Sequence, residues 1–259
     1  MRGYINANHG QLHYRSNLHR DGTPLLLLHQ SPSDSRMYDA LMRELDNQYW
    51  MIAPDNPGFG NSDPLPGGFD LPGCARAIRD LLDALEIPTT HVFGHHTGAT
   101  IAVQFTHDYP GRVAKLALCG PTLLSPEFKA ALPARAAPFA PEADGSHLVS
   151  MWQRMSSKEK SAEPALILRE VMSAFASGEN YSQAYSAVTD QAFEAQLTAL
   201  EHAVLVFCGT EDILYDQLEA TYRCLRNGQR AEIEGAGSFI CDRRPGEVAG
   251  LLGEFLGNS

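Results

Sequence analysis

The sequence lacks the features that mark membrane, nucleic-acid-binding and disulfide-rich proteins. No apolar run approaches the roughly 20 residues of a membrane-spanning helix. No basic patch appears and the net charge is −11, so we expect neither nucleic acid nor an anionic membrane as a partner. The cysteines are odd in number and form no C-x-x-C or Cys/His pattern typical of a metal site. We therefore expect reduced thiols, no metal and no cofactor.

The first residues, MRGYINANHGQLHYR, lack the apolar segment of a secretory signal peptide. Together with the reduced cysteines, this favours a cytoplasmic location. Internal repeats and low-complexity tracts are also lacking. Apolar residues make up 44% of the chain, which is the composition of a globular protein. The sequence leaves open whether the protein forms a homodimer.

Strand and helix patterns alternate through the first 120 residues. GYINA and QLHYR flank His9-Gly10 and read as a β-hairpin. Continuous apolar runs predict strands that are buried on both faces. The predicted strands cover 24–30, 50–55, 90–95 and 113–120, and the predicted helices cover 35–47, 74–87 and 97–109. This alternation predicts an α/β fold with a mostly parallel twisted sheet flanked by helices.

The alternation stops at Pro121. Up to about Leu200 only helical patterns occur: SPEFKAALPARA, HLVSMWQRMSS, PALILREVMSAFA and AYSAVTDQAFEAQL. Strand and helix patterns then resume over 203–212, 215–226, 230–235 and 245–256. We therefore predict an α/β core formed by residues 1–120 and 201–259, with a helical cap inserted at residues 121–200.

Several segments together resemble the α/β-hydrolase superfamily. In chain order they are LLLLHQSP, APDNPGFGNSD, VFGHHTGA, VLVFCGTED and EGAGSFICDRRPGEVAGLL. Each segment alone is a weak signal, but their order along the chain is specific. The resemblance implies the α/β-hydrolase fold, a cap over a pocket, a backbone oxyanion hole and a small-molecule substrate.

The sequence departs from the family pattern at two catalytic positions. The family's nucleophile elbow reads G-x-S-x-G, whereas this chain has Gly94-His95-His96-Thr97-Gly98, with His96 in the serine's place. The family's catalytic histidine follows a glycine before the last helix, and here that position holds Ser238. The acid position is matched by Asp212. The resemblance therefore implies a capped hydrolase fold with a degenerate triad.

His96 is the leading catalytic candidate. An elbow residue often has a positive φ, which histidine tolerates better than most residues, and imidazole titrates near neutral pH. We predict that His96 acts as a base or nucleophile, and that Asp212 orients it directly or through Ser238. A nucleophilic Ser238 is disfavoured because it would attack from outside the oxyanion hole. The alternative for His96 is a relic of a lost nucleophile.

The resemblance also implies supporting roles for neighbouring residues. The backbone amides of Gln30 and Thr97 would form the oxyanion hole. His29 and His95 are candidate substrate-binding residues, although His95 also suits a place packed beneath the turn. Asp212 has the alternative role of a helix N-cap, and Glu211 beside it is the alternative acid.

Two classes of function are consistent with these residues. The first is an enzyme acting on a small, mostly apolar carbonyl compound (an ester, lactone or ketone) by hydrolysis, C–C cleavage, cyclisation or elimination. The second is a non-catalytic ligand-binding or scaffold protein on the same fold, because a fold does not fix a function. Turnover distinguishes the two classes.

Overall fold

The computed structural model describes residues 1–257 and contains one eight-stranded sheet. The strand order is β1-β2-β4-β3-β5-β6-β7-β8. Strand β2 pairs antiparallel with β1 and β4, and every other neighbouring pair is parallel. The strands are β1 (Arg2–Ala7), β2 (Gly10–Ser16), β3 (Thr23–Leu28), β4 (Tyr49–Pro54), β5 (Thr90–His95), β6 (Val113–Cys119), β7 (Ala203–Gly209) and β8 (Gly228–Ile233). The predicted mostly parallel sheet is confirmed.

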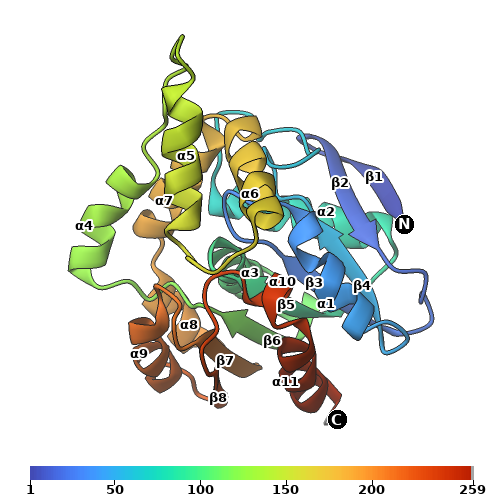
Figure 1. Cartoon of the computed structure of the whole chain (residues 1–259). Coiled ribbons are helices and arrows are strands. Elements are labelled where there is room, and N and C mark those ends of the chain that lie inside the picture. Colours follow the sequence, from blue (N-terminus) through green and yellow to red (C-terminus); the bar gives the residue numbers. More distant parts are fainter. Residues whose placement is uncertain (258–259) are drawn as a thin grey trace.

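Helices cover both faces of the sheet (Figure 1). One face packs against α2 (Leu71–Ala84) and α3 (Thr97–Asp108), and the other packs against α1 (Asp39–Glu44) and α11 (Pro245–Gly257). The central strands are buried on both sides, as their unbroken apolar runs predict. Both layers of helices therefore hold the carboxyl ends of β3, β5 and β7 in fixed positions.

Helix boundaries differ from the sequence patterns where a cap or a turn intervenes. Helix α2 begins at Leu71 rather than at Cys74, because the Asp70 side chain accepts a hydrogen bond from the Gly73 amide and caps the helix. The helix expected at 35–47 is divided into a 3-10 turn, η1 (Ser35–Tyr38), and the short helix α1.

The segment between β6 and β7 contains helices and, within its described residues 121–200, no strand. The helices are α4 (Pro126–Arg135), α5 (Ser146–Ser156), α6 (Pro164–Ala176), α7 (Asn180–Asp190) and α8 (Phe193–Ala199). We call residues 121–200 the insertion. Helices α4 to α7 stand at one end of the sheet (Figure 1). Helix α8 differs, because Phe193 and Leu197 pack into the hydrophobic core beside α3.

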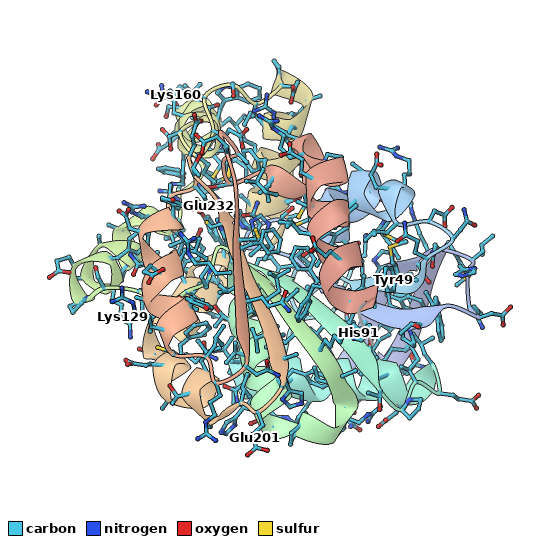
Figure 2. The ribbon with its side chains drawn as sticks, turned by 90° about the horizontal axis from the view of Figure 1, so that it is seen from below. Tyr49, His91, Lys129, Lys160, Glu201 and Glu232 are labelled. Atoms are coloured by element: carbon cyan, nitrogen blue, oxygen red, sulfur yellow. The ribbon has the colours of Figure 1, made fainter. Side chains whose placement is uncertain are left out.

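The part of the insertion between α5 and α6 lies at the end of the molecule opposite the start of β7. Figure 2 shows Lys160 of the insertion and Glu201, just before β7, at opposite ends of the view. The carboxyl ends of the parallel strands face the insertion, which is where open α/β sheets place their ligands. Within residues 1–257, no helix is both long and apolar enough to span a membrane.

Candidate active site

His96 occupies a strained turn between β5 and α3. Its φ and ψ are 49° and −114°, so the side chain projects from the sharp bend where the strand ends and the helix begins. The bend packs against the end of β3, where a Cβ on Gly98 would lie 1.9 Å from the Leu28 carbonyl oxygen. Only glycine at position 98 permits this close approach, which explains the second glycine of the GHHTG motif.

The His96 imidazole contacts the Asp212 carboxylate directly. Its Nε2 lies 2.9 Å from Oδ2 and 3.1 Å from Oδ1. Asp212 follows β7, and its Oδ1 also accepts a hydrogen bond from the Leu214 amide at 2.8 Å. Burial opposes ionisation of Asp212, but the attraction to His96 and the hydrogen bonds outweigh it and lower the carboxyl pKa to about 2. Asp212 is therefore a carboxylate at neutral pH, and it accepts a hydrogen bond from Nε2–H.

Gly120 fixes the ring from the other side. A Cβ at this position would lie 2.2 Å from His96 Cδ2 and 2.4 Å from Nε2. Gly120 has a φ of +58°, a conformation that glycine adopts without strain. The Cδ2–Nε2 edge of the imidazole therefore faces Gly120 and Asp212, so the Nδ1–Cε1 edge points away from them.

His96 lines a small pocket with a cavity volume of about 40 Å³, and Thr97 and Ser31 line it as well. Apolar side chains from α4 and α7, with Ile213 and Leu214, make most of its wall, and Thr122 and Tyr185 add hydroxyl groups. Among the residues that line it, His96 is the only histidine, and none is a lysine, an arginine or an acid. Within residues 1–257, Nδ1 has no hydrogen-bond partner and is not among the fully buried polar atoms, so it is at least partly accessible.

Larger hollows on the surface lie away from His96. One of them has a cavity volume of about 600 Å³, and its lining includes Gln104 and Gln191. Its lining contains neither His96 nor Asp212. We therefore place the site at the smaller pocket, because that pocket contains the reactive side chain.

The amides of Gln30 and Thr97 border the same turn. The Thr97 amide is the first of α3, and the first amides of a helix have no partner within it. Gln30 follows β3, and in the described chain its amide donates to no other residue. The two amides are thus free to donate to a bound group.

The His29 ring holds the Gln30 loop from inside. Its Nε2 accepts a hydrogen bond from the Asn56 amide at 2.8 Å, so the proton lies on Nδ1, which contacts the Gln30 carbonyl at 2.8 Å. His29 is fully buried and does not line the pocket. The geometry does not support the expected contact between His29 and substrate; it supports a role in shaping the loop.

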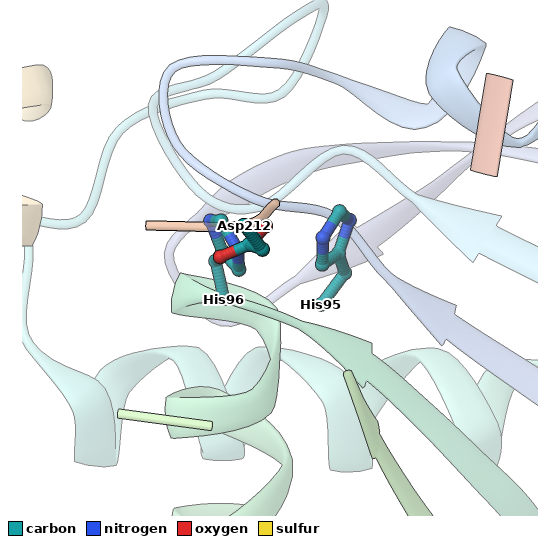
Figure 3. Close-up of side chains that lie close together, drawn as sticks. All are labelled: His95, His96 and Asp212. Atoms are coloured by element: carbon teal, nitrogen blue, oxygen red, sulfur yellow. The ribbon is translucent and has the colours of Figure 1, made fainter. Parts of the chain in front are cut away.

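His95 is also buried, and its ring lies against His96. The ring centroids are 4.4 Å apart, and Figure 3 shows both histidines beside the Asp212 carboxylate. Burial lowers the pKa of His95 well below its ordinary value, so the ring is neutral. His95 does not line the pocket, so the expected substrate contact is not supported for it either. Its place matches the alternative of packing beneath the turn.

His95, His96 and Asp212 could in principle hold a metal ion. One ligand atom from each lies within 4.8 Å of the others, and two imidazoles with a carboxylate suit zinc or iron. However, Asp212 already accepts hydrogen bonds from His96 and the Leu214 amide. The pocket beside them is lined by neither His95 nor Asp212. The geometry favours a hydrogen-bonded pair of His96 and Asp212.

Ser238 lies in the loop before α10 (Ile240–Arg243), a short helix that the sequence patterns do not reveal. Its side chain is fully buried, and within residues 1–257 its Oγ has no hydrogen-bond partner. The link from Asp212 to His96 is direct, so it does not require Ser238 as a bridge. The nearby thiols of Cys119 and Cys241 are buried, and burial raises the pKa of each well above its ordinary value, which leaves them unreactive.

Comparison of the sequence with protein families shows the family to which the chain belongs. The model of the alpha/beta hydrolase fold family matches residues 23–245, which include both β3 and the loop that carries Ser238. The chain belongs to the α/β-hydrolase family. The eight-stranded sheet with its flanking helices is accordingly the α/β-hydrolase fold.

Two of the relatives that match part of the chain are named as a depolymerase and a hydrolase. The chain is 34% identical to a poly(3-hydroxyalkanoate) depolymerase of Ectopseudomonas oleovorans over 96 residues, which are 37% of this chain and 34% of that protein. It is 31% identical to a 2-hydroxy-6-oxo-6-phenylhexa-2,4-dienoate hydrolase of Comamonas testosteroni over 119 residues, 44% of this chain and 41% of that one. The matched segments thus span well under half of each relative.

A solved structure aligns over nearly the whole chain. The structure of a thermophilic esterase from Thermogutta terrifontis aligns with 99% of this chain and 98% of its own, with a TM-score of 0.82 and 26% identity.

Three residues at or near the site were not identified from the sequence. Gly120 directly follows β6, and a glycine at the end of a buried strand next to the elbow is the sequence signal that could have indicated it. Tyr185 reaches the pocket from α7, where its sequence context is that of an ordinary helix. Glu170 is a buried carboxylate on α6, and its contact with Ser33 spans 137 residues, so no local signal exists for that contact.

Proposed function

We propose that this protein is a hydrolase in which His96 acts as a general base towards a small, uncharged, mostly apolar ester or lactone. The observation that carries the proposal is the orientation of the imidazole. Asp212 accepts a hydrogen bond from Nε2–H, Gly120 leaves room for that edge of the ring, and Nδ1 is left unpaired on a residue that lines the pocket. An unprotonated nitrogen facing a substrate pocket is what a general base requires.

In the proposed reaction, Nδ1 removes a proton from a water molecule while the water oxygen attacks the substrate carbonyl carbon. The imidazolium that forms is stabilised by the Asp212 carboxylate, which does not itself take the proton. As the tetrahedral intermediate collapses, Nδ1–H returns its proton to the leaving oxygen. The products are a carboxylic acid and an alcohol, and the ring regains its starting state.

The negative oxygen of the intermediate would be stabilised by the amides of Gln30 and Thr97. Thr97 begins α3 and Gln30 lies two residues after β3, so both are close to the sheet and need little reorganisation during the reaction. Removal of a single donor of this kind costs about 10²- to 10³-fold in kcat in other enzymes. The oxyanion hole and the base are thus expected to contribute to the rate separately.

The pocket supports the substrate class. Its wall contains aliphatic and aromatic side chains and hydroxyl groups, with no lysine, arginine or carboxylate to bind a charged group. A cavity of about 40 Å³ has room for little more than a water molecule. Substrate entry therefore requires movement of the wall formed by α4 and α7. The relatives named as a depolymerase, a dienoate hydrolase and an esterase are consistent with a carbonyl substrate.

The same base could begin other reactions, namely C–C cleavage, cyclisation or elimination of a ketone. It could also attack a carbonyl as a nucleophile and form an acyl-imidazole. Hydrolysis through a water molecule is favoured over direct attack of the imidazole on the carbonyl carbon, because Gly120 and Asp212 hold one edge of the ring in place. A protein that binds a ligand without turnover remains the second class, and it is favoured by the small cavity.

A panel of short-chain esters and lactones tests the proposal. We expect turnover by the wild-type protein, loss of turnover in His96→Ala, and no acyl adduct when the reaction is quenched and the intact protein is weighed by mass spectrometry. An acyl adduct on His96 would replace the general base with a nucleophile. Ligand binding without turnover across esters, lactones and ketones would favour the second class.

A further inference from the structure

The insertion reaches the Gln30 loop through a fully buried carboxylate. Glu170 lies on α6, and its Oε1 accepts a hydrogen bond from the Ser33 hydroxyl at 2.9 Å. The Ser33 amide in turn donates to the Gln30 carbonyl at 3.0 Å. Two hydrogen bonds therefore join Glu170 to the residue whose amide borders the pocket.

The neighbouring Arg169 extends this contact to the loop that carries Ser238. Its guanidinium binds Glu170 Oε1 at 2.8 Å and both oxygens of Asp242 at 2.7 and 2.8 Å. Asp242 lies on α10, directly after that loop. An ionic network, in which Glu170 is buried and Arg169 and Asp242 are half-buried, thus connects the Gln30 loop to the helix that follows the Ser238 loop.

A second contact lies one turn further along α6. The Ser173 hydroxyl donates to Asp34 Oδ2 at 2.9 Å, and Asp34 directly follows Ser33. Residues three apart share one face of a helix, so Glu170 and Ser173 present a single polar face to the loop. Helix α6 is therefore fixed to the core at the loop, whereas the pocket wall is formed by α4 and α7.

The second side-chain oxygen of Glu170 makes this arrangement energetically unfavourable if its only role is to fill the core. In the described residues, Oε2 is buried and has no hydrogen-bond partner. A buried carboxylate with an unpaired oxygen destabilises a fold, and apolar side chains of similar volume often pack at lower cost. The side-chain amide of Gln30 and the hydroxyl of Ser31 are likewise buried and unpaired. Unpaired polar groups thus gather on the loop beside His96, which indicates a site rather than a structural core.

We propose that Glu170 is a positioning residue that holds the Gln30 amide in place for the oxyanion. The inference rests on the proposed function, because it concerns the same oxyanion hole. Glu170 acts through Ser33 and does not touch the substrate. When the carboxylate is removed, the loop should lose its fixed register, while most of the pocket wall, which is formed by α4 and α7, keeps its shape; Ser31 is the one residue of the loop that lines the pocket.

The test compares Glu170→Ala, Glu170→Gln, Ser33→Ala and the Glu170→Ala/Ser33→Ala double variant with Glu163→Gln. Glu163 is a matched control, since it precedes α6 and pairs with Arg243 Nε at 3.4 Å but has no bond to the Gln30 loop. We expect Glu170→Ala and Ser33→Ala each to lower kcat about 10-fold, less than loss of an oxyanion donor, with KM changed by less than about 2-fold. The double variant should lose no more than either single variant, because both remove one chain of contacts. Glu170→Gln keeps an acceptor for Ser33 and should retain more of kcat than Glu170→Ala.

Hydrogen exchange at residues 30–33 provides a readout that does not depend on turnover. Exchange should accelerate in Glu170→Ala and Ser33→Ala and stay at the wild-type rate in Glu163→Gln. If exchange is faster in the variants but the wild-type protein hydrolyses no ester, the coupling of Glu170 to the Gln30 loop is supported and the proposed function is wrong. Unchanged exchange with wild-type kcat in both variants would overturn the positioning role and leave the proposed function intact. Additive losses in the double variant would also overturn it.

Discussion

The Nε2 atom of His96 lies 2.9 Å from Oδ2 of Asp212, and this contact determines which ring nitrogen is free. The carboxylate can only accept a hydrogen bond, so Nε2 carries a proton, and in the neutral ring Nδ1 carries none. In the usual serine triad the acid binds Nδ1 of the histidine and leaves Nε2 as the base. The pair of His96 and Asp212 has the opposite arrangement, because the imidazole projects from the elbow instead of approaching it from a neighbouring loop.

The Asp212→Asn variant tests whether Asp212 fixes the orientation and tautomer of the His96 ring in addition to supplying a negative charge. The asparagine amide would donate to Nε2 and favour the tautomer with the proton on Nδ1, which blocks the base. We expect kcat to fall by about 10³- to 10⁴-fold, as when the acid of a serine triad becomes an asparagine. The control is Glu211→Gln at the exposed neighbouring position. If Glu211→Gln loses more activity than Asp212→Asn, the acid has been assigned to the wrong residue.

Gly120→Ala tests whether the glycine makes room for the ring. The added Cβ would lie 2.2 Å from His96 Cδ2, so the imidazole must move. We expect a loss of kcat of at least about 10²-fold, in line with a displaced catalytic base. Gly145→Ala is the matched control, since Gly145 also has a positive φ, of +76°, but nothing lies within 4 Å of its added Cβ.

Both alanine variants should therefore lose about 1 kcal/mol or more of the free energy of unfolding through backbone strain. Only Gly120→Ala should lose activity. Equal activity in the two variants, measured on protein shown to be folded, would mean that the ring does not depend on the space at position 120.

The buried His95 should make the fold sensitive to mild acid. Its pKa is lowered by burial in the folded state, whereas in the unfolded chain it is about 6.5. Below that pH the unfolded state binds the additional proton, so the free energy of unfolding falls as pH falls from about 6.5 towards the lowered folded pKa. The slope contributed by this residue approaches about 1.4 kcal/mol per pH unit.

Urea unfolding between pH 7 and pH 5 measures this effect. His95→Gln should flatten the curve, and His107→Gln, a change at an exposed histidine, should not. A wild-type slope that persists unchanged in His95→Gln would show that other groups cause it.

A restored triad tests the correspondence between the two loops. In His96→Ser/Ser238→His, removal of the imidazole at the elbow frees Asp212 for a histidine at position 238, which would then activate the new serine. We expect a fluorophosphonate probe to label the double variant and to label neither the wild-type protein nor His96→Ser at a comparable rate. A folded double variant that resists the probe would show that Ser238 does not occupy the usual histidine position. Stoichiometric labelling of wild-type Ser238 would instead establish it as the nucleophile.

Much of the fold follows from local sequence, because central strands such as 90–95 are short apolar runs bounded by turns. The elbow can also be predicted from the sequence, since Gly94 and Gly98 flank His96 with the spacing that the strand-to-helix turn requires. The insertion was predicted as purely helical, but the sequence does not show that α8 packs with the core. That packing depends on the contact between Phe193 and the residues of α3, which no local pattern records.

The contacts within the site are less predictable, because they join residues far apart in the chain. His96 and Asp212 are 116 positions apart, and the sequence left open whether they meet directly or through Ser238. The Ser33–Glu170 contact spans 137 positions. Periodicity places Glu170 only on a helix, and its complete burial arises from the packing of α6 against the Gln30 loop.

The tautomer of His96 tests the central claim most directly. We propose a ¹⁵N–¹H correlation spectrum of the imidazole rings at about pH 9, well above the ordinary histidine pKa of about 6.5, with His96→Gln used to assign the resonances. The account predicts that His96 carries its proton on Nε2, that Nδ1 is unprotonated, and that Asp212→Asn shifts the proton to Nδ1. A wild-type ring with the proton on Nδ1 would contradict the account, because the nitrogen facing the pocket would then have no lone pair with which to act as a base.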